Sequence, residues 1–241
     1  MTYDWRARAL RFSAFPTGPL SPADFDRLWQ ACGAPTIELE EHKPNVSFRR
    51  RFGVIENSMG IDCQCLPDRV DLHVMPLAGP DGPTMELVPA FDAMDMFKVR
   101  CDAALHSIGV PVRRLALAGT VSIGCKSREE VYEVLGQLVP SVRLDPQKSR
   151  EFRYQINRPD QSSVLPDLLL NKLMTWVALR IEMRTMTTNI LVTEPRFLAT
   201  LEFDFNTDGA RSEPLPEVNL PALAVELDSS LRRIMEAGEL A

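Results

Sequence analysis

The feature that most constrains the fold of this chain is an order of elements that occurs twice. Residues 5–15 alternate in polarity as a strand does, and the phase changes near Ala9, which indicates a β-bulge. Ser21 has the position of a helix N-cap, with Pro22 after it and Asp24 in the first turn. The pattern of this first half then predicts strands over 46–55, 61–65 and 70–74 and a helix over 90–108.

The same order begins again after residue 110. The pattern predicts a strand over 115–123, a helix capped by Ser127, strands near 152–156, 177–183 and 197–205, and a last helix capped by Asn219. The two closing helices match position by position, and Asp102 and Asp228 occupy corresponding places in them. Internal matches of this kind are the mark of a repeated structural unit.

These elements predict an α+β protein. We expect one or two mainly antiparallel sheets with helices on one face, built by tandem duplication of a β-α-β-β-β-α unit. The halves are residues 1–110 and 111–241, and together they form one compact pseudo-symmetric unit. Because the strands alternate in polarity, the sheet face away from the helices meets water or a partner.

Composition narrows the classes of function. The chain has 241 residues, 45% of them hydrophobic and 25% charged, with a net charge of −6. No apolar run approaches the ~20 residues that span a bilayer, and the first residues lack the layout of a signal peptide. Five cysteines without C-x-x-C spacing favour free thiols. We predict a cytoplasmic protein with no membrane contact, for which nucleic acid is a possible but not favoured partner.

Residues 119–127 resemble a phosphate-binding loop. Gly119 and Gly124 have the spacing of the G-x-x-x-x-G-K-[ST] motif, but Cys125 separates Gly124 from Lys126. The alternation through residues 115–123 also continues as a strand, which leaves no loop to surround a phosphate. We interpret Ser127 as a helix cap and predict no nucleotide site.

Other chemical signatures are weak. Cys63 and Cys65 share a strand face with Ile61, whereas His73 lies opposite to Leu72 and so falls on the other side of the sheet. There is no G-x-S-x-G motif. We therefore predict no catalytic residue, no metal site and no cofactor, and we favour a non-enzymatic role while an enzyme stays open.

Two features supply candidate binding residues. Arginines recur within strands, and if the sheets align they would form an Arg-rich open face suited to an anionic partner. The alternative is that they are solvent-side residues paired with Asp and Glu. Residues 156–176 form a proline-containing connection between strands, and binding residues favour such loops. The candidates are Arg49, Arg51, Arg153, Asn157, Arg158, Asn171, Trp176 and Arg180.

The run from the 90–108 helix through VRRLALAGTVSI, the helix at 127–138 and LATLEFDFNTD to the closing helix resembles a known family. That family is bacterial, sporadically distributed, of similar chain length and without assigned function. The resemblance is one of architecture and covers the C-terminal three-fifths of the chain. Residues 118–121 depart from it, since the family carries an Arg-Tyr-x-Asn-like segment there. It implies a bacterial cytosolic protein and supplies no catalytic residues.

Three functions remain after these exclusions. We favour a binding or assembly component that acts through protein–protein contacts, as a homo-oligomer or with another protein. The first alternative is a double hot-dog-like acyl-thioester hydrolase or dehydratase, which needs an Asp, Glu or His at the interface of the halves, facing a long narrow tunnel. The second is binding of RNA or another anionic ligand by an Arg-rich sheet face.

Overall fold

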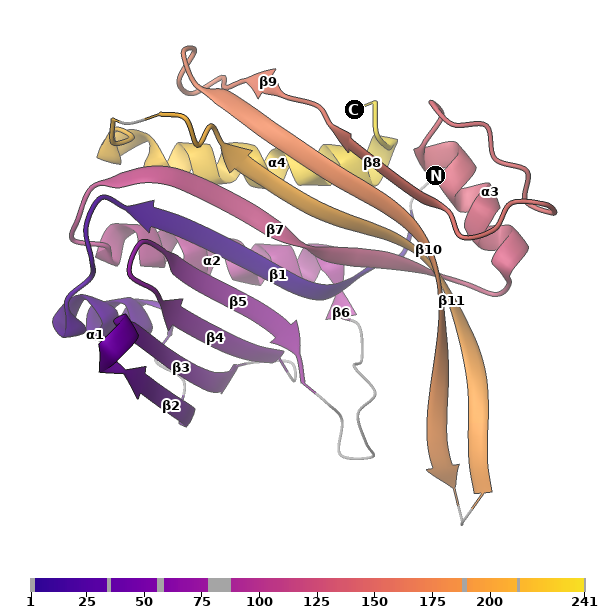
Figure 1. Ribbon diagram of the computed structural model, residues 1–241, viewed down its shortest axis with the longest axis horizontal. Helices are drawn as coiled ribbons and strands as arrows, with labels where there is room; N and C mark the ends of the chain where they lie inside the picture. Colours follow the sequence, from indigo (N-terminus) through magenta and orange to yellow (C-terminus); the bar gives the residue numbers. More distant parts are fainter. Residues whose placement is uncertain are drawn as a thin grey trace.

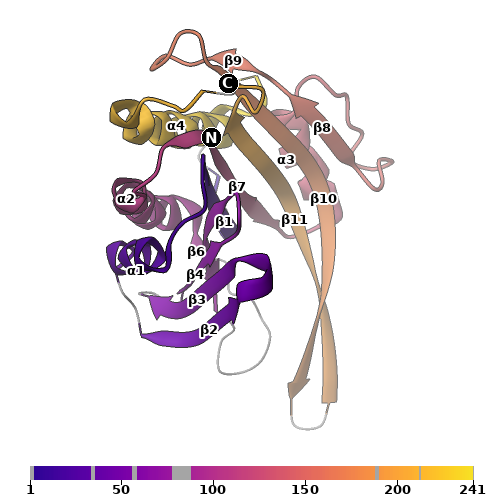
Figure 2. The ribbon, with the colours of Figure 1, turned by 60° about the vertical axis from the view of Figure 1, so that its left-hand side comes forward.

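The structure, a computed structural model, describes residues 3–33, 36–55, 59–77, 88–187, 190–211 and 213–240. Eleven strands of these residues form one sheet, and four helices cover one of its faces (Figure 1 and Figure 2). Every strand pairing in the sheet is antiparallel. The predicted α+β class, with a mainly antiparallel sheet and helices on one face, is confirmed.

The predicted elements occur in the predicted order, with three further short strands among them. The strands are β1 (Trp5–Pro16), β2 (Ile37–Lys43), β3 (Phe48–Ile55), β4 (Met59–Cys65), β5 (Val70–Pro76), β6 (Val88–Pro89), β7 (Val112–Cys125), β8 (Arg153–Asn157), β9 (Asp160–Gln161), β10 (Leu169–Thr187) and β11 (Ile190–Thr207). The helices are α1 (Pro22–Ala31), α2 (Ala90–Ser107), α3 (Arg128–Leu138) and α4 (Leu220–Ala237), with short 3-10 turns at Pro44–Val46 and Glu217–Asn219.

The centre of the sheet is the pair β1 and β7. Their register runs from Trp5 opposite Ile123 to Pro16 opposite Val112, with shifts between Ala7 and Ala9 and between Phe15 and Pro16. The shift between Ala7 and Ala9 confirms the predicted bulge, which lets the strand keep its apolar side towards the helices.

Strand order is mirrored about this central pair. The sheet reads β2-β3-β4-β5-β1-β7-β11-β10-β8, so β5, β4 and β3 stand on one side as β11, β10 and β8 stand on the other. Helix α2 packs on β1 and α4 on β7, while α3 lies over β10 and β11. Both halves share one sheet, and the boundary after residue 110 falls in the connection between α2 and β7. Tandem duplication as the origin of this order stays a prediction.

Three predicted details are wrong. Strand β2 was not expected, because nearly all of its side chains are exposed and give no buried alternation. Strand β10 begins at Leu169, so the second part of the predicted 156–176 connection is strand. Asn219 is the N-cap residue of α4, but its side chain makes no capping hydrogen bond, because the residue continues a 3-10 turn in helical conformation.

The core lies between the sheet and the helices. Large buried side chains from the strands meet those of the helices there, and each contributes about 1.5–3 kcal/mol by burial. Within the described residues, none of the helices is both long and apolar enough to cross a membrane. The most buried large side chains are Leu10, Phe25, Leu28, Trp29, Ile61, Leu72, Leu115, Tyr132, Leu135, Leu168, Trp176 and Phe205.

Candidate functional site

The stretch that resembles a phosphate loop is strand and helix cap. Residues up to Cys125 belong to β7 and pair with β1 on one side and β11 on the other. Ser127 Oγ accepts a hydrogen bond from the Glu130 amide at 3.3 Å, and Glu130 Oε2 accepts one from the Lys126 amide at 2.6 Å. The amides that would surround a phosphate are therefore occupied by the sheet and by the cap of α3.

The candidate arginines do not form one face. Arg49 and Arg51 stand opposite Cys65 and Cys63, on the side of the sheet that the helices cover. Arg180 is on that same side, near α3, whereas Arg153 stands opposite Val177 on the other side.

Most of these arginines already have acidic partners. The Arg51 guanidinium lies 2.8 Å from both Asp26 and Glu40, and 5.1 Å from the centre of the Phe25 ring. Arg153 pairs with Glu202 at 3.1 Å, and Arg180 pairs with Glu182 at 3.3 Å. This pattern matches solvent-side residues balanced by acids more closely than an anion-binding surface.

Two of the remaining candidates form a ladder on the open sheet face. Asn157 Nδ2 donates to Asn171 Oδ1 at 3.2 Å, and Asn171 Nδ2 donates to Asn206 Oδ1 at 3.4 Å. The Lys172 amide donates to Asn157 Oδ1 at 3.0 Å. These amides connect β8, β10 and β11, so their hydrogen bonds serve the sheet.

Arg158 and Trp176 have structural roles. Arg158 Nη2 lies 3.4 Å from a carboxylate oxygen of Glu239, whose side chain is fully buried and also accepts from the Ser141 amide at 2.9 Å. Trp176 is 0% exposed, and its ring centre lies 6.4 Å from that of Trp5. Arg158 therefore holds the C-terminal segment, and Trp176 belongs to the core.

The cysteines and His73 lie on opposite faces, as the sequence predicts. Cys63 and Cys65 are buried beneath α1, and burial raises the pKa of the Cys63 thiol well above its usual value. His73 stands opposite Arg11 and Asp62 on the open face, where burial lowers its pKa. Within the part of the chain that the structure describes, no three His, Cys, Asp or Glu side chains gather as a metal site would require.

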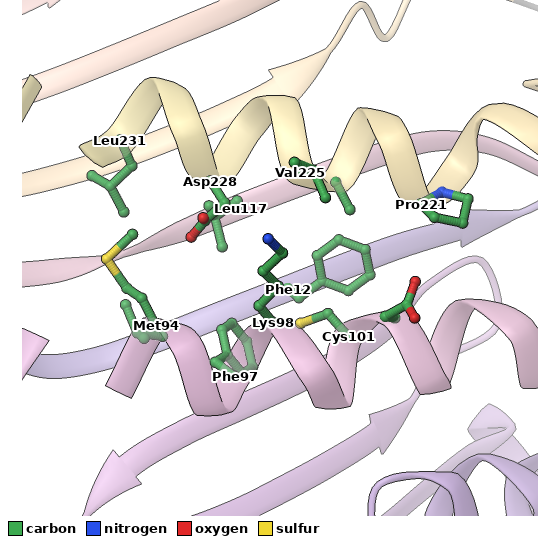
Figure 3. Close-up of a pocket in the computed structure, with 13 residues that line it drawn as sticks. Phe12, Met94, Phe97, Lys98, Cys101, Leu117, Pro221, Val225, Asp228 and Leu231 are labelled. Atoms are coloured by element: carbon green, nitrogen blue, oxygen red, sulfur yellow. The ribbon is translucent and has the colours of Figure 1, made fainter. Parts of the chain in front are cut away.

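A partly enclosed, mainly apolar cavity lies elsewhere, between α2 and α4 (Figure 3). The two helices run in opposite directions over the central strands, and the cavity between them has a volume of about 240 Å³. Its floor is Leu10, Phe12 and Leu117. Its α2 wall is Met94, Phe97, Lys98, Cys101 and Asp102, and its α4 wall is Pro221, Ala224, Val225, Asp228 and Leu231. We call this cavity the α2–α4 groove.

Charged side chains border the apolar floor of the groove. Arg232 Nε lies 2.8 Å from Asp228 Oδ2, and Arg232 Nη2 lies 2.7 Å from Asp95 Oδ1, so Arg232 links α4 to α2. Asp102 Oδ1 lies 3.8 Å from His106 Nδ1. Lys98 is exposed and its ammonium group is directed towards α4 (Figure 3), and no carboxylate of the described residues forms an ion pair with it.

Burial disfavours the thiolate form of Cys101, the thiol in the groove. Cys101 is buried in the α2 wall, and burial raises its pKa well above the usual value, which keeps the sulfur protonated. Sequence reasoning missed the groove because the helix pattern shows which side is apolar without showing where two helices leave a gap. One signal was present: Asp102 and Asp228 interrupt the apolar faces at corresponding places.

A second feature is a projecting ribbon. Strand β10 pairs with β8 as far as Val177, which stands opposite Arg153. Strand β11 pairs with β7 from Phe197 onwards, and Phe197 stands opposite Cys125. Beyond them the hairpin continues to Thr187 and Ile190 with only its own two strands as described partners (Figure 1). At about 3.3 Å per residue, this ribbon, residues 178–196, extends roughly 30 Å from the sheet.

Comparison with known proteins adds no assignment: no protein-family model matches the chain, and no curated protein matches its sequence.

Proposed function

We propose that this protein is an assembly component that binds a protein partner, or a second copy of itself, through the ribbon of residues 178–196. The observation that supports the proposal is the length over which this hairpin has no third strand among the described residues. An isolated two-stranded hairpin is only marginally stable in water. A bound partner strand or surface would supply the missing contacts.

The edges of the ribbon differ from the outer edge of the sheet. Strand β2 is short and carries four charged residues, Glu38, Glu40, Glu41 and Lys43, which discourage pairing with another chain. In the ribbon, by contrast, the nine residues from Thr185 to Thr193 include no charge, and their sequence is TMTTNILVT. Long strands with few charges are suited to pairing with another chain.

A shortened ribbon tests this function. Glu182 stands opposite Pro195, so residues 183–194 can be replaced by an Asn-Gly turn that closes the hairpin lower down. The sheet and helices of this variant should keep their circular dichroism spectrum, because no other described strand pairs with the removed residues. We expect the variant to lose self-association by light scattering and to lose the proteins that the full chain captures from its native lysate.

The matched control keeps the ribbon and changes only Thr188 and Asn189 to Asn-Gly. This variant should retain the partners of the full chain. If the shortened variant still captures the same partners, the ribbon is not the binding interface. A full chain that stays monomeric and captures nothing would contradict the assembly role itself.

The acyl-thioester alternative has one observation in its favour. The α2–α4 groove is apolar, lies where the halves meet and has Asp102 and Asp228 at its border. However, Arg232 engages Asp228 at 2.8 Å, which occupies the carboxylate that a hydrolase would need. Hydrolysis of short acyl-CoA thioesters, lost in Asp228→Asn and in Asp102→Asn, would favour this alternative.

The anionic-ligand alternative has less support. The candidate arginines lie on two faces, and Arg51, Arg153, Arg158 and Arg180 each have an acidic partner. Binding of RNA by this chain would be expected to weaken steeply with salt if it used such residues.

A further inference from the structure

We infer that two copies of this protein join through their ribbons, with the outer edge of β10 in one copy paired antiparallel to the same edge in the second copy. The twofold axis of this dimer passes beside Met183. The inference rests on the assembly role proposed above, and it specifies the partner, the strand edge and the register of pairing.

The edge of β10 becomes free where the segment that leads into β8 leaves it. The Ala178 amide donates to the Phe152 carbonyl at 3.1 Å. Glu151, the residue before Phe152, has a left-handed backbone with φ of 54°, so the chain before it does not continue as a strand along β10. From Leu179 to Thr187, β10 therefore has β11 as its only strand partner among the described residues.

Backbone alternation decides which residues of this free edge can bond to a second chain. Successive residues of an antiparallel strand direct their N–H and C=O groups to opposite sides. Ala178 directs its amide outward to Phe152, so every second residue after it also directs its backbone groups outward. These residues are Arg180, Glu182, Arg184 and Met186. Such a row of free donors and acceptors is a template for another strand.

The other edge of the ribbon, on β11, is less suited to pairing. Pro195 stands opposite Glu182 in the unbroken register of the hairpin. Because Glu182 directs its backbone groups away from β11, Pro195 directs its nitrogen away from β10, towards the outer edge of β11. Proline has no N–H to donate there and discourages the addition of a strand. From Leu179 to Thr187, by contrast, β10 contains neither proline nor glycine.

The free edge of β10 is complementary to itself. Met183 is the middle residue between Leu179 and Thr187, so pairing about Met183 uses the whole free edge of both copies. In this register Glu182 stands opposite Arg184 of the second copy, and the twofold axis repeats this pair of opposite charges. Both residues direct their backbone groups outward, so each of these pairs is a hydrogen-bonded one.

The neighbouring registers are less favourable. With the axis beside Glu182, this residue would stand opposite Glu182 of the second copy, and Arg180 would stand opposite Arg184. Like charges that stand directly opposite each other are destabilising. With the axis beside Ile181, the pairing would require the Ala178 amide, which is already bonded to the segment before β8. The axis beside Met183 avoids both costs.

The end of the second copy's ribbon meets a hollow in the first copy. With Thr187 of the second copy opposite Leu179, that end lies beside a cavity of about 620 Å³. Leu179, Arg180 and Phe197 line this cavity together with the start of α3. The ribbon carries no charge from Thr185 to Thr193, so its end can lie beside the cavity without burying an unpaired charge.

Charge inversion tests the register. In analytical ultracentrifugation, Glu182→Arg should weaken the dimer about tenfold, because two pairs of opposite charge become two pairs of like charge. Arg184→Glu should weaken it to a similar extent. The double variant Glu182→Arg with Arg184→Glu should return to within about twofold of the unchanged chain, because each pair is restored with its charges exchanged.

Arg180→Glu is the matched control for Glu182→Arg. Both substitutions break the ion pair of 3.3 Å between Arg180 and Glu182 within one chain. In the inferred register, however, Arg180 stands opposite the uncharged Met186 of the second copy. Arg180→Glu should therefore leave the dimer within about twofold of the unchanged chain. Equal weakening by Arg180→Glu and Glu182→Arg would overturn the inferred register.

A cysteine on the axis locates the interface without depending on charge. Met183 would stand opposite itself in a non-hydrogen-bonded pair, in which Cα atoms lie about 4.5 Å apart, a separation that a disulfide can join. Met183→Cys should therefore give a cross-linked dimer on oxidation with copper phenanthroline. Ile181→Cys should not, because its two copies would lie about 13 Å apart. The unchanged chain, with its own 5 cysteines, gives the background.

The possible results distinguish this dimer from the wider assembly role. A chain that stays monomeric but captures a different protein through the ribbon would overturn the dimer and support the assembly role. Self-association that is lost on shortening the ribbon, without cross-linking of Met183→Cys and without an effect of Glu182→Arg, would overturn the pairing of β10 alone. A monomer that captures nothing would contradict both.

Discussion

Glu226 shows how single side chains hold the irregular segments of this fold. It lies on α4, and its carboxylate accepts hydrogen bonds from Ser162 Oγ at 2.5 Å, from the Ser163 amide at 2.6 Å and from Ser163 Oγ at 2.7 Å. Burial opposes ionisation of Glu226, but the hydrogen bonds from the two serines outweigh it and lower its pKa. The ionised carboxylate therefore fastens the connection between β9 and β10 to α4.

The lowered pKa gives a pH-dependent prediction. Because the folded pKa of Glu226 is below the unfolded value of about 4.3, its contribution is present above that value and is lost as the pH falls through the folded pKa. Glu226→Gln should lower the free energy of unfolding by about 1–2 kcal/mol at pH 7, and by less near pH 3. Urea unfolding at both pH values measures the difference.

The control for Glu226 is Glu133→Gln, which changes an exposed carboxylate on α3. Its effect should be small at either pH. A Glu226→Gln penalty that stays constant from pH 7 to pH 3 would show that ionised Glu226 does not hold the connection.

For single residues, the sequence predicts which face of a strand a side chain occupies better than it predicts what the side chain contacts. The Ser127 cap and the opposite faces of Cys63 and His73 follow from local spacing, and both are confirmed. The shared face of Arg49 and Arg51 also follows from spacing. That α1 covers this face could not be predicted, because which side of a sheet a helix covers depends on contacts between distant segments.

At the scale of secondary-structure elements, the pairing of β1 with β7 requires glycine at position 119. A Cβ atom at this position would lie 2.4 Å from the backbone oxygen of Ala9 and 2.9 Å from the Phe203 ring. The close approach occurs beside the β1 bulge, since Gly119 pairs with Leu10 and the register shifts between Ala7 and Ala9. Glycine is therefore needed here for space between two backbones.

Gly119→Ala should lower the free energy of unfolding by about 1–3 kcal/mol, since backbone atoms of β1 would have to shift. Gly136 is the matched control, because a Cβ atom there meets nothing within 4 Å and the residue lies inside α3. Gly136→Ala should instead raise stability by about 0.5–1 kcal/mol. Urea unfolding distinguishes the two, and a neutral or stabilising Gly119→Ala would contradict the crowding between β1 and β7.

Element boundaries were predictable where burial alternates. The first helix, the bulged first strand and the strand that ends at Cys125 all have a clear apolar period. The start of β10 at Leu169 was missed because polar Asn171, Lys172 and Thr175 make this stretch resemble a loop. Asn171 and Lys172 have partners on β8 and β9, since Asn157 donates to Asn171 Oδ1 and Asp160 lies 3.1 Å from Lys172 Nζ.

For the whole molecule, the shared sheet predicts that both halves unfold together. Strand β1 of the first half pairs with β7 of the second, and α2 packs against α4. Trp29 on α1 and Trp176 on β10 are buried at the two ends of this core. Separate unfolding of one half would expose a large apolar surface of the other, which favours a single cooperative transition.

Two single-tryptophan variants test this cooperativity. One keeps Trp29 and the other keeps Trp176, with the remaining tryptophans changed to Phe. In each variant, the urea midpoint from fluorescence should coincide with the midpoint from far-ultraviolet circular dichroism. A fluorescence transition at Trp29 that precedes loss of the overall signal would indicate halves that unfold independently.

The overall arrangement was predictable only in part. The repeated order of elements predicts two similar halves, and the structure has a mirrored strand order about β1 and β7. That the halves join edge to edge in one sheet depends on pairing between strands far apart in the sequence, on which local patterns carry no information. The groove and the ribbon both arise from this joining and were missed for the same reason.

The central place of β1 also has a consequence for synthesis of the chain. Strand β1 is made first, but its partner β7 ends only at Cys125. At a ribosomal rate of about 5–20 residues per second, one edge of the nascent β1 stays open for several seconds. During translation, a strand from the centre of the finished sheet therefore waits for its second neighbour until more than a hundred further residues have been added.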